Sequence, residues 1–327
     1  MKCSRKIKII GFFFAICVFV CFFAYGMPES GTGERAKIYV AIVAKSTTSA
    51  YWKTTFAGAK AAGAEYNLEI TFEGPENEED YETQNLMISR AVENGADAIV
   101  LSAVDYNANA EAVNKAVAAG VKVVVIDSDV NSDLVSCRIS TDNYKAGKMV
   151  GEAVLFGKED TLRVGIVNFD ENSENGQQRE KGFRDYVEGN ERVTIVSAVN
   201  VNSTTEEAKE ATIKMLKEYP EINIVVTFNE WTSLGVGYAV QELDVSDETR
   251  VVAFDSNVVS VGMLETGEVD ALVVQNPYAM GYLGVEYAWM LVNGEKIKES
   301  EIDTTTTLIT RENMYEPENQ KVLFSFD

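Results

Sequence analysis

The sequence predicts an α/β protein built from two Rossmann-like lobes, each with a parallel sheet and helices on both faces. Three observations predict this class. From residue 37 onward, short runs rich in valine, isoleucine and alanine alternate with segments of helical spacing. The runs are almost continuously apolar, as is typical of strands that helices cover on both sides. A chain of 327 residues is also long for one domain and suits two.

The first series of elements ends near residue 140. Its expected strands are KIYVAIVA, LEITFEG, DAIVLSA and VKVVVIDS. Three segments between them have helical spacing: residues 52–66, 81–94 and 107–119. Gly95 and Gly120 follow two of these segments, where glycine commonly ends a helix. The charge run PENEED, residues 75–80, is typical of a solvated loop that leads into a helix.

The second series begins near Thr141. Its expected strands are LRVGIVNF, VTIVSAV, INIVVTF, RVVAFDS and DALVVQN. The segments with helical spacing are residues 143–156, 176–188, 205–218, 231–243, 256–265 and 278–292. Strands that alternate with helices of this length indicate parallel sheets made of right-handed βαβ units.

Composition excludes several classes of function. The chain has 51 acidic and 29 basic residues, a formal net charge of −22, so its surface repels phosphate backbones and nucleic acid is not an expected partner. Histidine is absent, which removes the commonest general base and transition-metal ligand. Cys137 is the only cysteine beyond the N-terminal segment, and one cysteine cannot build a thiolate metal site. We therefore expect no metal and no cofactor.

The N-terminus has the pattern of an export signal. A basic head precedes the apolar run from residue 9 to residue 24, and Ala24-Tyr25-Gly26 is a small-x-small cleavage site. Residues 1–26 are thus expected to be a signal peptide, and residues 27–36 a linker. The alternative is an anchor retained through residues 9–26. Either way the body is exported, to the periplasm or the cell surface. Cys17 and Cys21 lack the preceding small residue that a lipoprotein signal requires.

Polar and aromatic side chains gather just after the expected strands. Ligands of open α/β sheets bind beyond the carboxyl ends of the strands, so these positions are the candidate site. They include Lys45, Tyr51, Trp52, Ser102, Asp127, Ser128, Thr141, Gln177, Asn229, Asp255 and Gln275. Carboxylates and amides form paired hydrogen bonds with vicinal hydroxyls, and aromatic faces pack on the C–H faces of a sugar ring. The set is typical of a site for a small sugar or polyol.

Structural roles remain open for several of these residues. Tyr51 and Trp52 could staple a helix onto its sheet. Asp127, Asp142 and Asp255 could be helix N-caps. Lys45 could be a surface lysine.

The order and spacing of several motifs resemble a known family. The motifs are AYWKTTFAGAKAAG, ADAIVLSAVD, GVKVVVIDSDV, ISTDNYKAGKMVGE, NGQQREKGF, VTFNEWTSLGVGYAVQE, VVAFDSN and VVQNPYAMGYLGVE. Over roughly residues 37–311 the chain resembles the type I periplasmic sugar-binding proteins, the ribose-binding-like substrate receptors of ABC transporters. The resemblance implies a type I periplasmic binding protein fold with a three-crossing hinge. The crossings are expected near Thr141, near Asn276 and in DTTTTLIT.

The resemblance also implies roles for individual residues. Tyr51 and Trp52 match paired rings that stack on the sugar, and Asp127 matches a carboxylate that accepts ring hydroxyls. The second lobe contributes Asn229, Asp255 and Gln275, with Phe254 and Phe228 beside them, while Thr141 lies at a crossover.

Some positions depart from the ribose binders. Ser128 and Gln177 stand where arginines are common, so two guanidinium groups are expected to be missing. Lys45 brings a cation instead, as in the autoinducer-2 receptors. However, Asn175 and Gly176 replace a further Asp-Gln pair of those receptors.

The resemblance implies a first lobe of residues 37–140 plus 276–302 and a second lobe of residues 141–275 plus 303–327. Hinge closure on the ligand would precede delivery to the permease of an ABC importer, and the protein is expected to be a monomer and not an enzyme. The alternative is a sensor of a sugar or autoinducer-2-like ligand that feeds a two-component or chemotaxis receptor. A LacI-type regulator lacks support because no helix-turn-helix head is present. A glycosidase could use paired carboxylates, but no catalytic motif accompanies them.

Overall fold

The computed structural model describes residues 37–324. The expected signal peptide or anchor and the linker lie outside the described residues, as do residues 325–327. Within residues 37–324, no helix combines the length and hydropathy of a membrane-spanning segment.

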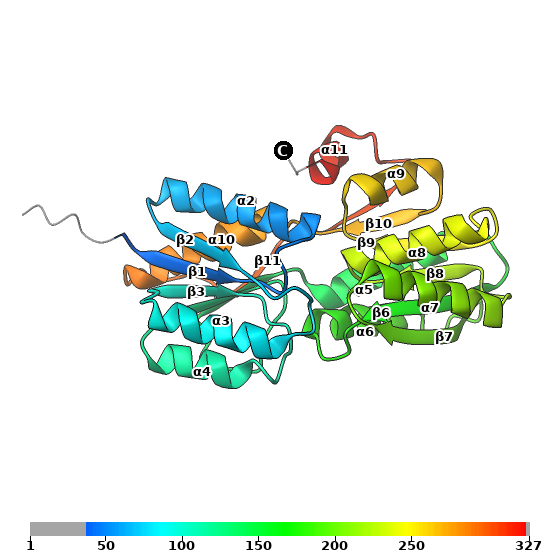
Figure 1. The fold of residues 1–327 in the computed structure, drawn as a ribbon. Coiled ribbons are helices and arrows are strands. Elements are labelled where there is room, and N and C mark those ends of the chain that lie inside the picture. The colour runs from blue at the N-terminus through cyan, green and yellow to red at the C-terminus, as the bar shows by residue number, and fades with distance from the viewer. Residues whose placement is uncertain (1–36, 325–327) are drawn as a thin grey trace, which may run out of the picture. The chain divides into compact units, whose positions relative to one another are not determined.

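The first lobe contains a six-stranded parallel sheet with the strand order β11-β5-β4-β3-β1-β2. Its strands are β1 (Tyr39–Val43), β2 (Glu69–Glu73), β3 (Ala98–Leu101), β4 (Lys122–Ile126), β5 (Cys137–Ser140) and β11 (Glu301–Asp303). Its helices are α2 (Ala50–Glu65), α3 (Tyr81–Glu93), α4 (Ala110–Ala118) and α10 (Pro277–Val292). Helices α2 and α10 cover one face of the sheet, and α3 and α4 cover the other (Figure 1). A buried apolar cluster lies on each side.

The second lobe repeats this plan with the strand order β12-β10-β9-β8-β6-β7. Its strands are β6 (Leu162–Phe169), β7 (Val193–Val201), β8 (Ile224–Thr227), β9 (Arg250–Phe254), β10 (Ala271–Val274) and β12 (Thr307–Thr310). Its helices are α5 (Asn143–Leu155), α6 (Glu174–Val187), α7 (Thr205–Glu218), α8 (Glu230–Leu243), α9 (Val258–Thr266) and α11 (Pro317–Leu323). Two further apolar clusters fill the layers between this sheet and its helices.

The predicted fold class is confirmed, including the three crossings between the sheets. The chain passes from β5 to α5, from β10 to α10 and from β11 to β12. Sequence periodicity missed the short strands β5, β11 and β12 and the helix α11. It also predicted parallel strands only, whereas β12 is antiparallel to β10. Strand β12 starts directly after the third crossing, at the carboxyl edge of the sheet, and so must run against its neighbours.

Glycines fix two helix pairs at close range. A Cβ at Gly58 of α2 or Gly281 of α10 would lie 2.0 or 1.8 Å from a backbone oxygen of the opposite helix. In the second lobe, a Cβ at Gly147 of α5 or Gly182 of α6 would each lie 2.0 Å from such an oxygen. These contacts allow no side chain. They hold α2 against α10 and α6 against α5. Helices α2 and α6 follow the first strand of their lobes, and α10 and α5 follow the crossings between the lobes.

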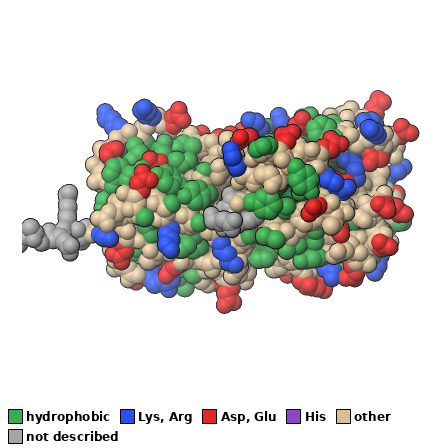
Figure 2. Space-filling view, turned by 90° about the horizontal axis from the view of Figure 1, so that it is seen from above, with side chains coloured by type: hydrophobic (Ala, Val, Ile, Leu, Met, Phe, Trp, Pro, Cys, Tyr) green, Lys and Arg blue, Asp and Glu red, His purple; other side chains and the backbone are tan. Residues whose placement is uncertain are grey.

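On the face seen from above, charged side chains are not separated by sign. In the view from above, acidic and basic side chains are scattered along the outline, and hydrophobic side chains gather over the first lobe, where α2 and α10 lie (Figure 2). This pattern agrees with the apolar composition of α10, in which most residues are buried or half-buried.

Candidate functional site

The carboxyl ends of the two sheets meet at one pocket, where about 310 Å³ of space, part of it open to solvent, is free of protein atoms. Both lobes contribute to its walls. The first lobe provides Lys45, Ser49, Tyr51, Trp52, Glu78 and Asp127. The second lobe provides Phe169, Asn175, Arg179, Asn229, Glu230, Trp231, Asp255 and Gln275.

The structure brings most of the sequence-predicted residues to this pocket. Those that line it are Lys45, Tyr51, Trp52, Asp127, Asn229, Asp255 and Gln275. Ser102, Thr141, Phe228 and Phe254 lie behind these residues and contact them or their neighbours. Ser128 is buried, and its hydroxyl has no hydrogen-bond partner among the described residues. Gln177 does not reach the pocket.

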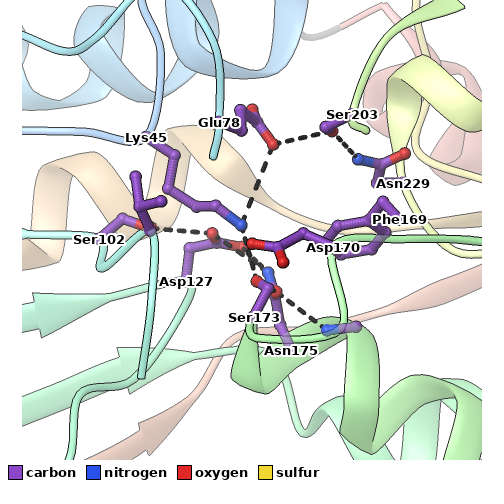
Figure 3. A network of polar contacts seen from close by, with 12 residues as sticks. Lys45, Glu78, Ser102, Asp127, Phe169, Asp170, Ser173, Asn175, Ser203 and Asn229 are labelled. Carbon is purple, nitrogen blue, oxygen red and sulfur yellow. Dashed lines mark hydrogen bonds and ion pairs between the residues drawn. The ribbon is translucent and has the colours of Figure 1, made fainter. Parts of the chain in front are cut away.

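Asp127 is the centre of the polar network in the first lobe (Figure 3). It follows β4 directly and has a left-handed backbone with φ of 58°. Its carboxylate accepts hydrogen bonds from the Tyr51 hydroxyl at 3.0 Å and the Ser102 hydroxyl at 2.9 Å. Asn175, from the second lobe, donates to both carboxylate oxygens at 3.3 Å. Burial, and then the charges of Asp127 and Asp255, raise the pKa of Tyr51 well above its ordinary value, so this phenol remains a donor.

Arg179 of α6 is fully buried and hydrogen-bonded through all three of its nitrogens. Nε donates to Asn143 Oδ1 at 2.9 Å, and Nη1 donates to the backbone oxygen of Phe228 at 2.8 Å. Nη2 donates to Gln275 Oε1 at 2.8 Å and lies 3.8 Å from Asp127 Oδ1. The guanidinium therefore connects the polar groups of both lobes.

Although the arginines expected at positions 128 and 177 are absent, the pocket does contain a guanidinium group. Arg179 lines it and stacks on the Phe254 ring, 4.2 Å from the ring centroid. Gln177, the position compared with the family's arginine, is exposed and donates to the backbone oxygen of Glu171. Two residues along a helix differ in direction by about 200°, so Gln177 and Arg179 face opposite ways. Residues 175, 176, 179, 182 and 183 form one buried stripe along α6. This helical spacing is the sequence signal that could have identified Arg179, rather than Gln177, as a pocket residue.

Lys45 is buried, with 1% of its surface exposed, so the surface interpretation was wrong. Its Nζ donates to Ser173 Oγ of the second lobe at 2.7 Å. The same nitrogen lies 4.0 Å from Glu78 Oε2 and 5.2 Å from the centroid of the Phe169 ring. Lys45 thus already has polar partners in both lobes.

Glu78 is a pocket residue that the sequence analysis missed. It belongs to PENEED, which was interpreted as a solvated loop, yet Glu78 is only 7% exposed. Its carboxylate accepts a hydrogen bond from Trp52 Nε1 at 2.8 Å and another from the Ser203 hydroxyl of the second lobe at 3.1 Å. Burial raises the pKa of Glu78, and the charge of Lys45 opposes that shift. A charge run gives no sign of burial, because the covering surface comes from the other lobe.

Asp255 occupies in the second lobe the place that Asp127 has in the first. It follows β9 directly, has φ of 65° and is 6% exposed. Gln275 Nε2 donates to its Oδ1 at 2.7 Å, and Thr141 donates to Gln275 Oε1 at 2.9 Å. Burial is the main cause that raises the pKa of Asp255 to about 7, and Arg179 opposes it.

The N-cap interpretation holds for only one of the three aspartates. Asp142 caps α5 by accepting from the Lys145 N–H. Neither Asp127 nor Asp255 caps a helix, since Asn257 caps α9 and no helix follows β4 directly. Asn229, another predicted site residue, caps α8 and also donates to the Ser203 hydroxyl at 2.6 Å.

The rings form apolar walls beside these polar groups. Tyr51 and Trp52 meet edge to face, with centroids 5.0 Å apart and planes at 85°. Both also belong to the apolar core beneath α2, so the pair fastens the helix to its sheet and lines the pocket. Phe169 and Trp231 add rings from the second lobe.

The pocket carries both signs of charge. Its cations are Lys45 and Arg179, and its carboxylates are Glu78, Asp127, Glu230 and Asp255. Among residues 37–324, no group of acidic, cysteine or histidine side chains is arranged to hold a metal ion. The arrangement suits a ligand with many hydroxyl groups, which can donate to carboxylates and accept from amides.

Comparisons with known proteins agree with this geometry. Residues 40–296 match the periplasmic binding protein domain family. A D-ribose/D-allose-binding protein from Pseudomonas aeruginosa is 28% identical over 290 residues, which cover 85% of this chain and 90% of that protein.

Two solved structures share the fold. A carbohydrate transporter solute binding protein from Agrobacterium radiobacter, in complex with D-arabinose, has a TM-score of 0.85 at 29% identity and covers 88% of this chain and 99% of its own. An ABC transporter solute binding protein from Agrobacterium vitis, with bound D-fucose, has a TM-score of 0.84 at 29% identity and covers 88% of this chain and all (100%) of its own.

Proposed function

This chain belongs to the periplasmic binding protein family, whose members bind solutes rather than transform them, and we propose that it is the sugar receptor of an ABC importer. In this proposal it is exported, acts as a monomer, closes its two lobes on a small neutral sugar or polyol, and presents the closed form to a membrane permease. The observation that carries the proposal is the pocket between the lobes, where aromatic rings stand beside carboxylate and amide groups.

The relatives support a carbohydrate ligand. The three compared proteins are described with D-ribose or D-allose, D-arabinose and D-fucose. These sugars differ in size and stereochemistry, so they support the class of ligand rather than one sugar.

The pairing of the pocket cations favours a neutral ligand. Arg179 directs each of its nitrogens to a protein oxygen, and Lys45 is bonded to Ser173 and close to Glu78. An anionic ligand would have to break these pairs, and it would also meet buried carboxylates such as Asp255. Because an unpaired charge in a buried site is costly, sugar acids and sugar phosphates should bind poorly.

In the proposed complex, Tyr51 and Trp52 pack against the sugar ring, while Asn229, Asp255 and Gln275 bond its hydroxyls. Contacts from both lobes to one ligand exist only when the cleft is closed, so they stabilise closure.

The test is a binding screen over pentoses, hexoses, polyols and autoinducer-2, with uronic acids and sugar phosphates as charged counterparts. At 100 times its Kd, a ligand should stabilise the protein by about 2.7 kcal/mol, which a thermal-shift assay detects. Calorimetry then gives the Kd. Binding of a sugar acid in preference to every neutral sugar would contradict the neutral-ligand proposal, and no shift with any carbohydrate would contradict the proposed function.

Two variants test the pocket itself. Asp255→Ala and Trp52→Ala should each weaken binding of the best ligand by about 10-fold or more. Gln177→Ala is the control, since Gln177 is exposed and outside the pocket. Circular dichroism checks that all three variants fold. If both pocket variants bind like the control, the site lies elsewhere.

A further inference from the structure

Glu230 crosses from the second lobe to the first. It is the first residue of α8, is 6% exposed, and its side chain lies at the start of α2. Its Oε2 accepts the backbone N–H of Tyr51 at 3.0 Å, and its Oε1 accepts the backbone N–H of Ala50 at 3.3 Å. Asn257 Nδ2 also donates to Oε1, at 2.9 Å, and thereby holds the carboxylate in place from its own lobe.

The start of α2 needs such an acceptor. The first N–H groups of a helix have no partner within the helix. The side chain of Ser49, the N-cap of α2, accepts the N–H of Trp52 and not those of Ala50 or Tyr51, and α2 has no acidic residue in its first turn. Glu230 therefore supplies from the opposite lobe the negative charge that a helix N-terminus favours.

The contact falls on the part of α2 that carries the pocket rings. Ala50 and Tyr51 are its first two residues, and Trp52 follows. With donors on both of its oxygens, Glu230 is already occupied by protein groups even though it lines the pocket. Asp255, by contrast, receives the Gln275 amide on Oδ1.

We propose that Glu230 is a positioning residue that caps α2 across the cleft and thereby favours the closed state. The inference rests on the proposed closure of the lobes around a ligand. It assigns Glu230 no bond to that ligand. Opening separates α8 from α2, so water then replaces the carboxylate at the helix start.

The main test compares Glu230→Gln with Glu242→Gln. Glu242 is on the same helix and pairs with Lys209 of α7, away from the cleft. Glu230→Gln should weaken binding about 5-fold, the equivalent of about 1 kcal/mol for a charge at a helix N-terminus. The loss should be the same for every sugar that binds, because it acts on closure. Glu242→Gln should bind as the wild type does.

A second variant removes the other side of the contact. Ala50→Pro deletes one donor N–H at the first helical position, which tolerates proline. Ser49 before it has φ of −72° and ψ of 163°, a conformation that proline allows. If the contact is the cause, Glu230→Gln and Ala50→Pro should be non-additive in a double-mutant cycle.

Hydrogen exchange gives a readout that needs no ligand. The amide of Tyr51 should exchange more slowly in the wild-type protein than in Glu230→Gln, and small-angle scattering should find the variant more open. If no carbohydrate binds in the screen, the proposed function is contradicted. The exchange and scattering measurements on the wild-type protein and Glu230→Gln can still be compared, because they need no ligand. The proposal about Glu230 is overturned if its variant matches Glu242→Gln in both affinity and exchange. Changed affinity ratios among sugars would overturn it too, since they would make Glu230 a ligand contact.

Discussion

Asp127 and Asp255 occupy equivalent positions in the two lobes but have different surroundings. Asp127 follows β4 and Asp255 follows β9, and each of these strands lies next to the strand, β5 or β10, from which the chain crosses to the other lobe. Both aspartates have a left-handed backbone. Asp127 accepts from Tyr51, Ser102 and Asn175. For Asp255 the bonded partner is Gln275, and burial raises its pKa to about 7. The same fold position thus holds one carboxylate that the protein saturates and one that it leaves poorly compensated.

This difference leads us to expect different tasks for the two carboxylates. A saturated carboxylate that accepts from both lobes stabilises the fold and the closed cleft. A carboxylate with a raised pKa gains most from new donors, and sugar hydroxyls are such donors. We therefore expect Asp127 to act on stability and Asp255 on affinity.

The largest expected effect comes from exchanging each aspartate for asparagine. Asp127→Asn should lower the free energy of unfolding by about 2–3 kcal/mol, since it removes the charge that several buried donors share. Asp255→Asn should leave the ligand-free protein as stable or more stable at pH 8, because an ill-compensated charge disappears, and should weaken sugar binding by about 10-fold or more. Denaturant unfolding and calorimetry measure both quantities. Equal destabilisation by the two variants would remove the distinction.

A change in pH should have a smaller effect, on the balance between the open and closed forms of the ligand-free protein. With the lobes in contact, as in this structure, burial raises the pKa of Asp255 to about 7, and exposure in an open cleft should return it toward the ordinary value of about 3.9. Closure of the empty protein therefore takes up a proton between these values. The population of the closed form should be highest below about pH 4 and fall as the pH rises toward about 7. Above that pH it should change little.

Glu174 acts in the same direction, since burial and the charge of Asp129 raise its pKa to about 7. Small-angle scattering of the empty protein at pH 5 and pH 8 should find the more compact form at pH 5. The double variant Glu174→Gln, Asp255→Asn is the control and should weaken this dependence, of which Glu78 keeps a part because burial raises its pKa too. A wild-type protein that is more compact at pH 8 would reverse the predicted sign.

The smallest effect tests one donor of the saturated carboxylate. Ser102→Ala removes the hydroxyl that donates to Asp127 Oδ2 and leaves the other donors. It should cost about 1 kcal/mol of stability and weaken binding by less than about 3-fold, well below the loss for Asp255→Asn. Should Ser102→Ala weaken binding as strongly as Asp255→Asn, Asp127 would have to be counted as a ligand acceptor.

The sequence alone determined the architecture. Alternating apolar runs and helical segments predicted both sheets and their covering helices, because burial on two faces leaves a pattern in each strand. The residue types that follow β1, β4, β8, β9 and β10 also indicated where the pocket would form, since parallel strands bring their carboxyl ends to one edge. Strand β12, which is short and starts at a crossing, has no such pattern, and its antiparallel direction follows from the path of the chain.

Tertiary structure decided which side chains meet across the cleft. Glu78 looks like part of a solvated loop until Ser203 of the other lobe covers it. Arg179, rather than Gln177, turns inward because α6 packs against α5 through glycine contacts. Glu230 becomes the cap of α2 only when the lobes meet. The physical reason is that periodicity records burial within one lobe, whereas pairing between lobes depends on three-dimensional placement that no local pattern encodes.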